Sequence, residues 1–214
     1  MMNETSLILV TGFAPFPGAP ENPTQWLADH LTGGGWQPGN AQVATRLLPT
    51  TFDVFEDVLG PAIRELKPAA VISFGLSAKA TGFTLERIAK NSIATDRPDT
   101  EGALAREAYL DASGPGQCGS ALPLNEIARR LKSEGLPWGW SDDAGDYLCN
   151  LVFYRARRAL TAAPTGFIHV PYLDSQKTRL AARGEISADL ATMSETQLLK
   201  GARIIVSAVA DSLR

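Results

Sequence analysis

Short, largely apolar runs constrain the fold of this chain more than any other feature of its sequence. They are Leu7–Val10, Ala69–Phe74 and Gly166–Val170, and a glycine or proline follows each of them within two residues. Such runs are typical of strands that are buried on both faces of a parallel sheet. Residues 41–48 alternate in character instead, which predicts a strand at or near the edge of that sheet.

Segments with helical periodicity separate these runs. The clearest start signals are Asn22-Pro23, where Asn caps and Pro takes the first helical position, and the capping box Ser194–Gln197. Gly145-Asp146 introduces a further helix, with Asp146 as its expected N-cap. The predicted helices cover residues 22–32, 52–66, 123–132, 147–160 and 194–213.

This alternation predicts an α/β fold with three layers, α/β/α, around a twisted and largely parallel central sheet. A chain of 214 residues, of which 44% are hydrophobic, can bury a core of its own, and no shift in composition marks a domain boundary. We therefore expect a single domain over residues 1–214. Residues 89–117 carry several Gly and Pro and little periodicity, and we expect them to form long functional loops.

Charge and cysteine content exclude several classes of function. The formal net charge is −3 and the Lys and Arg residues are scattered, so the chain lacks a basic footprint for nucleic acid or an anionic membrane. The two cysteines are too few for a disulfide scaffold and lack zinc-ligand spacing. The first residues carry no basic stretch, and Leu7–Val10 is too short for a signal sequence or a membrane span. We therefore expect a cytoplasmic protein.

Candidate nucleophiles and bases are few, because the chain has two cysteines and two histidines. With Asp146 as N-cap, Cys149 stands at the third helical position, where free backbone N–H groups and the helix dipole favour a thiolate over a thiol. The alternative is that Cys149 packs beside Leu151 as a small core residue. Cys118 has no histidine in its own segment and is interpreted as a bystander.

His169 is the candidate base. It lies near the carboxyl end of the run Gly166–Val170, at the edge where open parallel sheets place their sites. The alternative is a structurally satisfied histidine, and the residue alone does not decide between the two. His30, just before Gly33–Gly35, is interpreted as a solvated or helix-capping residue.

A catalytic histidine needs a third polar group to fix its tautomer, and Glu, Asp or Asn can serve. Glu86 lies in a segment where an extended backbone would turn it to the face opposite Phe83 and Leu85. The alternative is a solvated glutamate, and composition does not single out Glu86 among the acids.

The loop Thr11–Gly18 follows the first run at the carboxyl edge of the sheet and lacks the spacing of a phosphate-binding loop. Its Phe13 and Phe16, braced by Gly and Pro, suggest the wall of an apolar pocket. The alternative is that these rings tuck back onto the core.

A series of short motifs runs in order along nearly the whole chain. The motifs are Val10–Phe16, Asn22-Pro23, Leu48–Thr50, Phe74–Leu76, Glu86–Asn91, Pro98–Gly102, Leu122-Pro123, Tyr147–Asn150 and Gly166–Tyr172. In this order they resemble the pyroglutamyl peptidase I family, also called pyrrolidone-carboxylate peptidases, which are cysteine peptidases of the C15 type.

The resemblance implies an activity and a set of residue roles. Members of the family remove an N-terminal pyroglutamyl residue from peptides, without a metal or cofactor. The nucleophile, the base and the orienting acid of the family fall on Cys149, His169 and Glu86. Its substrate-binding residues fall on Phe13, Phe16, Thr50, Leu76, Tyr147 and Leu148. The phenylalanines would line the lactam pocket, backbone groups around Leu76 would bind the lactam amide, and Tyr147-Leu148 would close one wall.

Two positions depart from the family pattern. Members often carry an Arg where this chain has Ala80, and another Arg where the ungapped match gives Asp96. Arg97 stands one residue later, and in an extended segment such a slip points a side chain to the other face. The departures leave two alternatives open: a related amidase or peptidase for another small cyclic or N-acyl group, and a noncatalytic pyroglutamyl-binding relative.

The oligomeric state does not follow from the sequence. Members of the resembling family are often dimers or tetramers, so a homo-oligomer is kept as an expectation. Trp138 and Trp140, on either side of Gly139, predict an interface, a covered edge strand or a short core strand.

Overall fold

The computed structural model describes residues 5–17, 19–187 and 189–213. Residues 1–4, on which part of the localisation argument depends, lie outside the described residues, as does Gly18 of the loop after the first strand.

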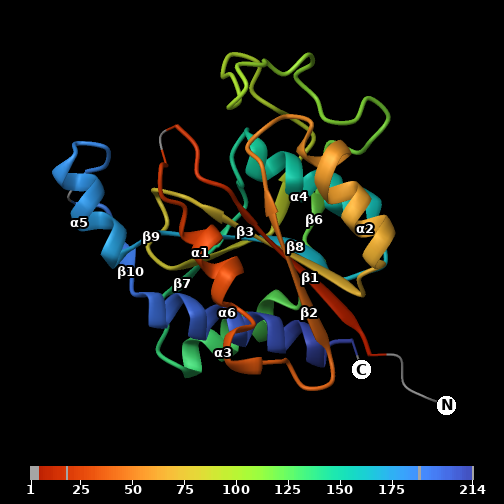
Figure 1. The fold of residues 1–214 in the computed structure, drawn as a ribbon. Coiled ribbons are helices and arrows are strands. Elements are labelled where there is room, and N and C mark those ends of the chain that lie inside the picture. The colour runs from red at the N-terminus through yellow and green to blue at the C-terminus, as the bar shows by residue number, and fades with distance from the viewer. Residues whose placement is uncertain (1–4, 18, 188, 214) are drawn as a thin grey trace.

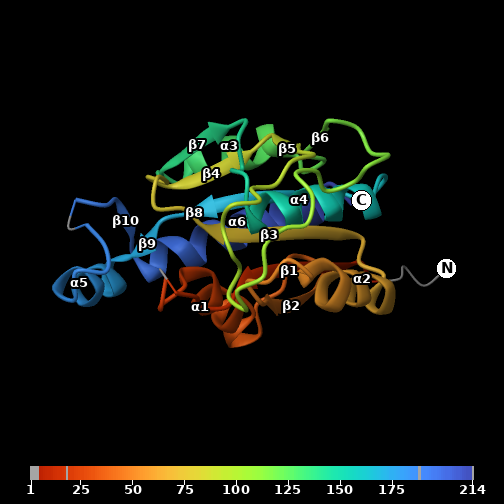
Figure 2. The same cartoon turned by 90° about the horizontal axis from the view of Figure 1, so that it is seen from above.

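A six-stranded sheet forms the centre of the fold, with the strand order β2-β1-β3-β8-β4-β7. Figure 2 shows this order, from β2 at the bottom to β7 at the top. The strands are β1 (Leu7–Phe13), β2 (Gln42–Leu48), β3 (Ala70–Leu76), β4 (Phe83–Glu86), β7 (Trp138–Ser141) and β8 (Thr165–Val170). The apolar runs thus form three neighbouring central strands, and residues 41–48 form an edge strand, as predicted.

Neighbouring strands are parallel except at one position, where β4 runs antiparallel to β8. Only residues 77–82 connect β3 to β4. A crossover to a parallel strand needs about a dozen residues or more, so the chain turns back at the carboxyl edge of the sheet. The largely parallel sheet is confirmed, and its one antiparallel pairing brings β4 beside β8.

Helices cover both faces of the sheet, which confirms the three-layer architecture (Figure 1). One layer holds α1 (Pro23–His30), α3 (Leu124–Ser133) and α6 (Glu195–Asp211). The other holds the π-helical turn η2 (Phe55–Leu59), α2 (Gly60–Leu66) and α4 (Leu148–Ala159). Alternate strand residues supply the two cores: Ile72 and Phe74 of β3 belong to the first layer's core, and Val71 belongs to the second.

Two of the helix starts follow the predicted signals. The Asn22 side chain accepts a hydrogen bond from the Thr24 N–H, and Ser194 and Gln197 form the capping box of α6. The helix predicted over residues 52–66 begins later, at about Val54. The Phe52 N–H donates to Asp99 Oδ2 at 3.0 Å, and this contact with the long loop holds residues 51–53 in a turn.

The segment between β4 and α3 is mostly loop, as expected from its Gly and Pro content. Its ends pair as a small antiparallel ribbon of β5 (Ile88–Lys90) and β6 (Gln117–Gly119). The remaining elements are η1 (Gly33–Gly35), β9 (Tyr172–Leu173), α5 (Asp174–Ala182) and β10 (Thr192–Met193). Figure 1 shows the long loop at the top and α5 standing out at the left.

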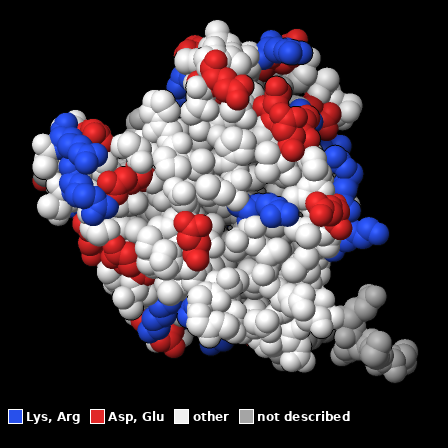
Figure 3. Space-filling view, in the orientation of Figure 1, with Lys and Arg blue, Asp and Glu red and all other residues white. Residues whose placement is uncertain are grey.

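Strand β7 is the end strand of the sheet, so Trp138 and Trp140 belong to an edge strand. Trp138 packs against the core of the first helix layer, whereas Trp140 is 41% exposed. Figure 3 shows that charged side chains gather over the long loop, over α5 and along the right-hand edge of this face, and that basic and acidic side chains also lie nearer its centre. Among the described residues, no helix is long and apolar enough to cross a membrane.

Candidate active site

Cys149 lies in the first turn of α4. The helix begins at Leu148 with Tyr147 as N-cap, so the prediction of Asp146 as N-cap is wrong by one residue. The Asp146 carboxylate pairs with Arg97 instead, and its carbonyl oxygen accepts a hydrogen bond from the Ala94 N–H at 2.7 Å. Cys149 is therefore the second helical residue, still among the free N–H groups at the positive end of the helix dipole.

His169 and Glu86 form a buried pair across the antiparallel strands β8 and β4. His169 Nδ1 donates to Glu86 Oε1 at 2.7 Å, and the two residues are 7% and 1% exposed. Cross-strand pairing sets Thr84 opposite His169 and Glu86 opposite Phe167, so both members of the pair point to the α4 side of the sheet. The alternative of a solvated Glu86 is wrong.

Gly75 lets the thiol approach this pair. Gly75 of β3 is the cross-strand neighbour of His169, and the Cys149 side chain hydrogen-bonds to His169. A Cβ atom at position 75 would lie 2.6 Å from Phe167 Cζ and 3.0 Å from Cys149 Sγ. The first distance is shorter than real Cβ contacts and the second is tighter than most of them, so a side chain at position 75 would displace the Phe167 ring or the thiol above the end of β3.

The surroundings of His169 change its pKa in opposing directions. Burial lowers the pKa. The charge and the hydrogen bond of Cys149 raise it, as do the hydrogen bond and the charge of Glu86, and the net result is a pKa of about 9. These neighbours favour the protonated imidazolium of His169. A cysteine and a histidine in this relation can act as nucleophile and general acid–base.

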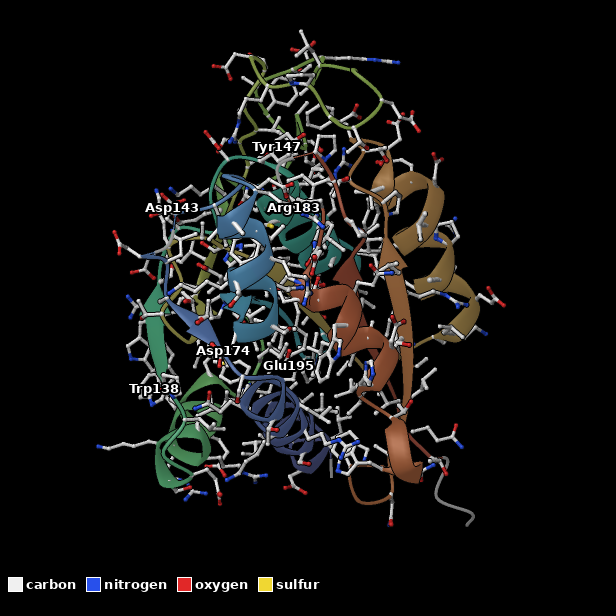
Figure 4. The ribbon with its side chains drawn as sticks, turned by 60° about the vertical axis from the view of Figure 1, so that its left-hand side comes forward. Trp138, Asp143, Tyr147, Asp174, Arg183 and Glu195 are labelled. Carbon is white, nitrogen blue, oxygen red and sulfur yellow. The ribbon has the colours of Figure 1, made fainter. Side chains whose placement is uncertain are left out.

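A cavity of about 620 Å³ opens beside these groups. It is bordered by all of the site residues implied by the resemblance: Phe13, Phe16, Thr50, Leu76, Glu86, Tyr147, Leu148, Cys149 and His169. Phe13 is buried between the cavity and the core, with its ring 6.4 Å from that of Phe167, and Phe16 is half-buried. Figure 4 labels Tyr147 and Asp143, which border the cavity from the segment between β7 and α4, and Trp138 at the start of β7.

The long loop closes one side of the cavity. The Tyr147 hydroxyl donates to the carbonyl oxygen of Pro98 at 2.7 Å, and the Tyr147 ring meets Phe52 edge to face at 5.7 Å. Arg97 also borders the cavity, and its guanidinium lies 4.7 Å from the centre of the Tyr147 ring. The expectation that a one-residue slip turns Arg97 away is wrong, because residues 95–97 form a bend and do not obey strand alternation. Ala80 is buried at the cavity wall.

Asn150 is a residue that the sequence did not single out for a role. It is fully buried, accepts a hydrogen bond from the Lys90 N–H, and donates to the carbonyl oxygens of Lys90 and Ser92, all at 2.8 Å. These bonds tie the residue after Cys149 to the segment that follows Glu86. A polar residue on the inner side of a helix was the available signal, because buried amides need partners.

The other cysteine and histidine lie outside the cavity lining. Burial raises the pKa of the Cys118 thiol, which suits an inert cysteine. His30 Nδ1 lies 2.7 Å from the Trp26 carbonyl oxygen, and its ring stacks on Trp26. Among the described residues, no group of three or more His, Cys, Asp or Glu could hold a metal ion.

Known proteins resemble this chain over almost its full length, both in sequence and in structure. Residues 6–212 match the family model described as pyroglutamyl peptidase, peptidase family C15. The pyrrolidone-carboxylate peptidase of Pyrococcus furiosus is 36% identical over 90% of this chain and 94% of its own length. That of Cupriavidus pinatubonensis is 38% identical over 87% of each chain.

Solved structures agree with the sequence comparison. A mutant pyrrolidone carboxyl peptidase from P. furiosus superposes with a TM-score of 0.86 at 33% identity, covering 97% of this chain and 100% of the other. Pyroglutamyl peptidase I from Bacillus amyloliquefaciens gives a TM-score of 0.85 at 28% identity, covering 96% and 97%. By sequence and by structure, this chain belongs to the pyroglutamyl peptidase family, peptidase family C15.

Proposed function

We propose that this chain is a cysteine peptidase that removes an N-terminal pyroglutamyl residue from peptides through an acyl-enzyme. The observation that carries the proposal is the buried His169–Glu86 pair beside the Cys149 thiol, at the wall of a cavity that also carries Phe13 and Phe16. Family membership supports the same reaction.

In the proposed reaction, the Cys149 thiolate attacks the carbonyl carbon beyond the lactam ring, and backbone N–H groups at the start of α4 stabilise the oxyanion. His169 gives its proton to the leaving amine, and the C–N bond breaks. Water then attacks the thioester while His169 accepts a proton from it, and the Cys149 thiolate leaves. Glu86 holds the Nδ1–H tautomer of His169 throughout.

Charge pairing at the cavity supports selectivity for a neutral N-terminus. Each carboxylate that lines the cavity already has a cationic partner: Glu86 with His169, Asp143 with Lys90, and Asp146 with Arg97. An ordinary peptide would bring an unpaired ammonium group into this wall. A pyroglutamyl ring brings none, and it suits apolar walls with a few hydrogen bonds. In the proposal, Phe13, Phe16, Thr50, Leu76, Tyr147 and Leu148 form this pocket.

A panel of fluorogenic amides tests the proposal. Pyroglutamyl amide should be hydrolysed in the presence of reductant and chelator. Prolyl amide, which has the same ring with a charged nitrogen and no lactam oxygen, should not. Hydrolysis of a different N-acyl amide in preference to the pyroglutamyl amide would establish the related amidase instead. Binding of pyroglutamyl amide without hydrolysis would establish the noncatalytic relative.

We further propose that residues 1–214 form one domain that acts in the cytoplasm. Both hydrophobic clusters face the same six-stranded sheet, which supports a single folding unit. A single cooperative unfolding transition and a light-scattering mass would test the domain and the expected dimer or tetramer.

Turnover should fall as the pH rises through about 9. His169, whose pKa is raised to about 9, then loses the proton that it gives to the leaving amine. Alkylation of Cys149 by iodoacetamide should not fall over the same range, because it needs only the thiolate. The two rates are measured as a function of pH on the same preparation. A parallel decline of both rates above this pH would contradict the assignment of the proton to His169.

Gly75→Ala should lower kcat about 100-fold, since a displacement of about 1 Å at a reacting group has an effect of this size. The added methyl group must displace Phe167 or Cys149. Gly201→Ala is the matched control, because its Cβ would lie 2.2 Å from Phe83 Cε2, in the core on the opposite face of the sheet. The control should lose stability in urea but keep the kcat of its folded fraction. Equal kcat for Gly75→Ala and the wild type would contradict the close approach.

A further inference from the structure

One oxygen of the Glu86 carboxylate has no partner among the described residues. Oε1 accepts the hydrogen bond from His169, whereas Oε2 is buried without a donor. The Glu86 side chain is 2% exposed and borders the cavity. A buried carboxylate oxygen is costly to leave unpaired, so its surroundings should supply a hydrogen-bond donor.

The strand register identifies what surrounds this oxygen. Thr84 and Glu86 are two residues apart on β4 and point to the same face. On β7, Gly139 lies opposite Thr84 and Ser141 lies opposite Glu86. Thr84 and Ser141 also border the cavity, and a Cβ atom on Gly139 would meet no atom within 4 Å. The cavity thus reaches Glu86 between two hydroxyl groups, and the space at Gly139, beside Thr84, is open.

Neither hydroxyl is placed to satisfy Oε2 directly. Same-face neighbours on a strand lie about 6.6 Å apart, which is too far for a direct bond from the short Thr84 side chain. The Ser141 hydroxyl donates to the Asp143 carbonyl oxygen at 3.2 Å and accepts from the Asp143 N–H at 3.1 Å, so its proton is already used. The Thr84 hydroxyl forms no hydrogen bond within the described part of the chain.

We propose that this space is a binding site for one ordered water molecule, and that Thr84 is a positioning residue that acts through it. The water donates to Glu86 Oε2 and to Ser141 Oγ, and it accepts the proton of the Thr84 hydroxyl. These three bonds are the number that a buried water typically makes. The proposal rests on the proposed function only in the role given to His169.

The water acts by fixing the carboxylate. With both oxygens bonded, Glu86 keeps Oε1 in line with His169 Nδ1 and keeps its charge against the imidazolium. The titratable groups that face His169 are Glu86 from β4 and Cys149 from α4. Loss of the water therefore weakens the imidazolium–thiolate pair without removing any group that touches the substrate.

Thr84→Val tests this site, because valine keeps the branched shape and removes the hydroxyl. The rate of iodoacetamide alkylation of Cys149 is measured from about pH 5 to about pH 9. The rate profile of the variant should lie about one pH unit above that of the wild type, so that alkylation on the acid side of the profile is about tenfold slower. For pyroglutamyl amide, kcat should fall about tenfold and KM should stay unchanged, because the water does not touch the substrate. Thr84→Ser should restore both values. Thr45→Val, on the far edge strand β2, is the control for hydroxyl loss and should match the wild type.

The outcomes separate the water site from the proposed function. Wild-type alkylation and kcat in Thr84→Val would overturn the site. If that variant does not fold, a high-resolution crystal structure of the wild type decides, and density without a water within hydrogen-bond distance of Oε2 would overturn it as well. A Thr84-dependent alkylation profile in an enzyme that does not hydrolyse pyroglutamyl amide would support the site and refute the proposed function.

Discussion

Cys149→Ala is expected to reduce the turnover of pyroglutamyl amide at least about 10⁴-fold, because removal of the nucleophile from a catalytic triad has effects of this size or larger. Among the described residues, the side-chain hydrogen bonds that act on the pKa of His169 come from Cys149 and Glu86, so the substitution removes the nucleophile that is bonded to the base. The measurement is kcat/KM at neutral pH beside a urea unfolding curve. The unfolding midpoint should change little, because Cys149 is only half-buried.

Cys118→Ala is the matched control for this experiment. Cys118 lies on β6 outside the cavity lining, and burial raises the pKa of its thiol, so its removal should leave turnover unchanged. Mass spectrometry after brief alkylation should find the label on Cys149 and not on Cys118. Turnover by Cys149→Ala within about tenfold of the wild type would refute the proposed nucleophile.

Local sequence signals predicted most of the fold. The apolar runs became β1, β3 and β8, and the caps at Asn22 and Ser194 begin α1 and α6. The signals failed where a tertiary contact overrides a local preference. Asp146 pairs with Arg97 of the long loop and so does not cap α4, and the contact of Phe52 with Asp99 delays the start of the helix predicted over residues 52–66.

Local sequence patterns predicted less of the candidate site than of the fold. His169 and Glu86 are 83 residues apart, and they meet because β4 pairs antiparallel with β8. From the sequence, an alternating strand such as β4 looks half-solvated, whereas Glu86 is buried in the folded chain, which is why a solvated Glu86 remained an alternative. The resemblance named these residues, whereas the patterns did not choose among the acids. The roles inferred for Gly75 and Thr84 depend on cross-strand register, which no local pattern reports.

Glu86→Gln is expected to lower kcat by about 10³- to 10⁴-fold with little change in KM, the scale seen when a triad loses the charge that orients its histidine. The amide has nearly the same shape, so the fold should persist, but it cannot balance an imidazolium and it can donate to Nδ1 and stabilise the wrong tautomer.

The same substitution should shift the pH dependence in a defined direction. Because the Glu86 carboxylate contributes to raising the pKa of His169 to about 9, its neutralisation should move the alkaline fall of the residual turnover to lower pH. Glu126→Gln is the matched control: Glu126 lies on α3, away from the cavity, and pairs with Arg129 and Arg130. That variant should keep both the wild-type kcat and the wild-type alkaline limb. An unchanged alkaline limb in Glu86→Gln would show that Glu86 does not set the proton affinity of His169, even if turnover fell. A loss of rate together with a shift of the alkaline limb to lower pH would assign both effects to the Glu86 carboxylate.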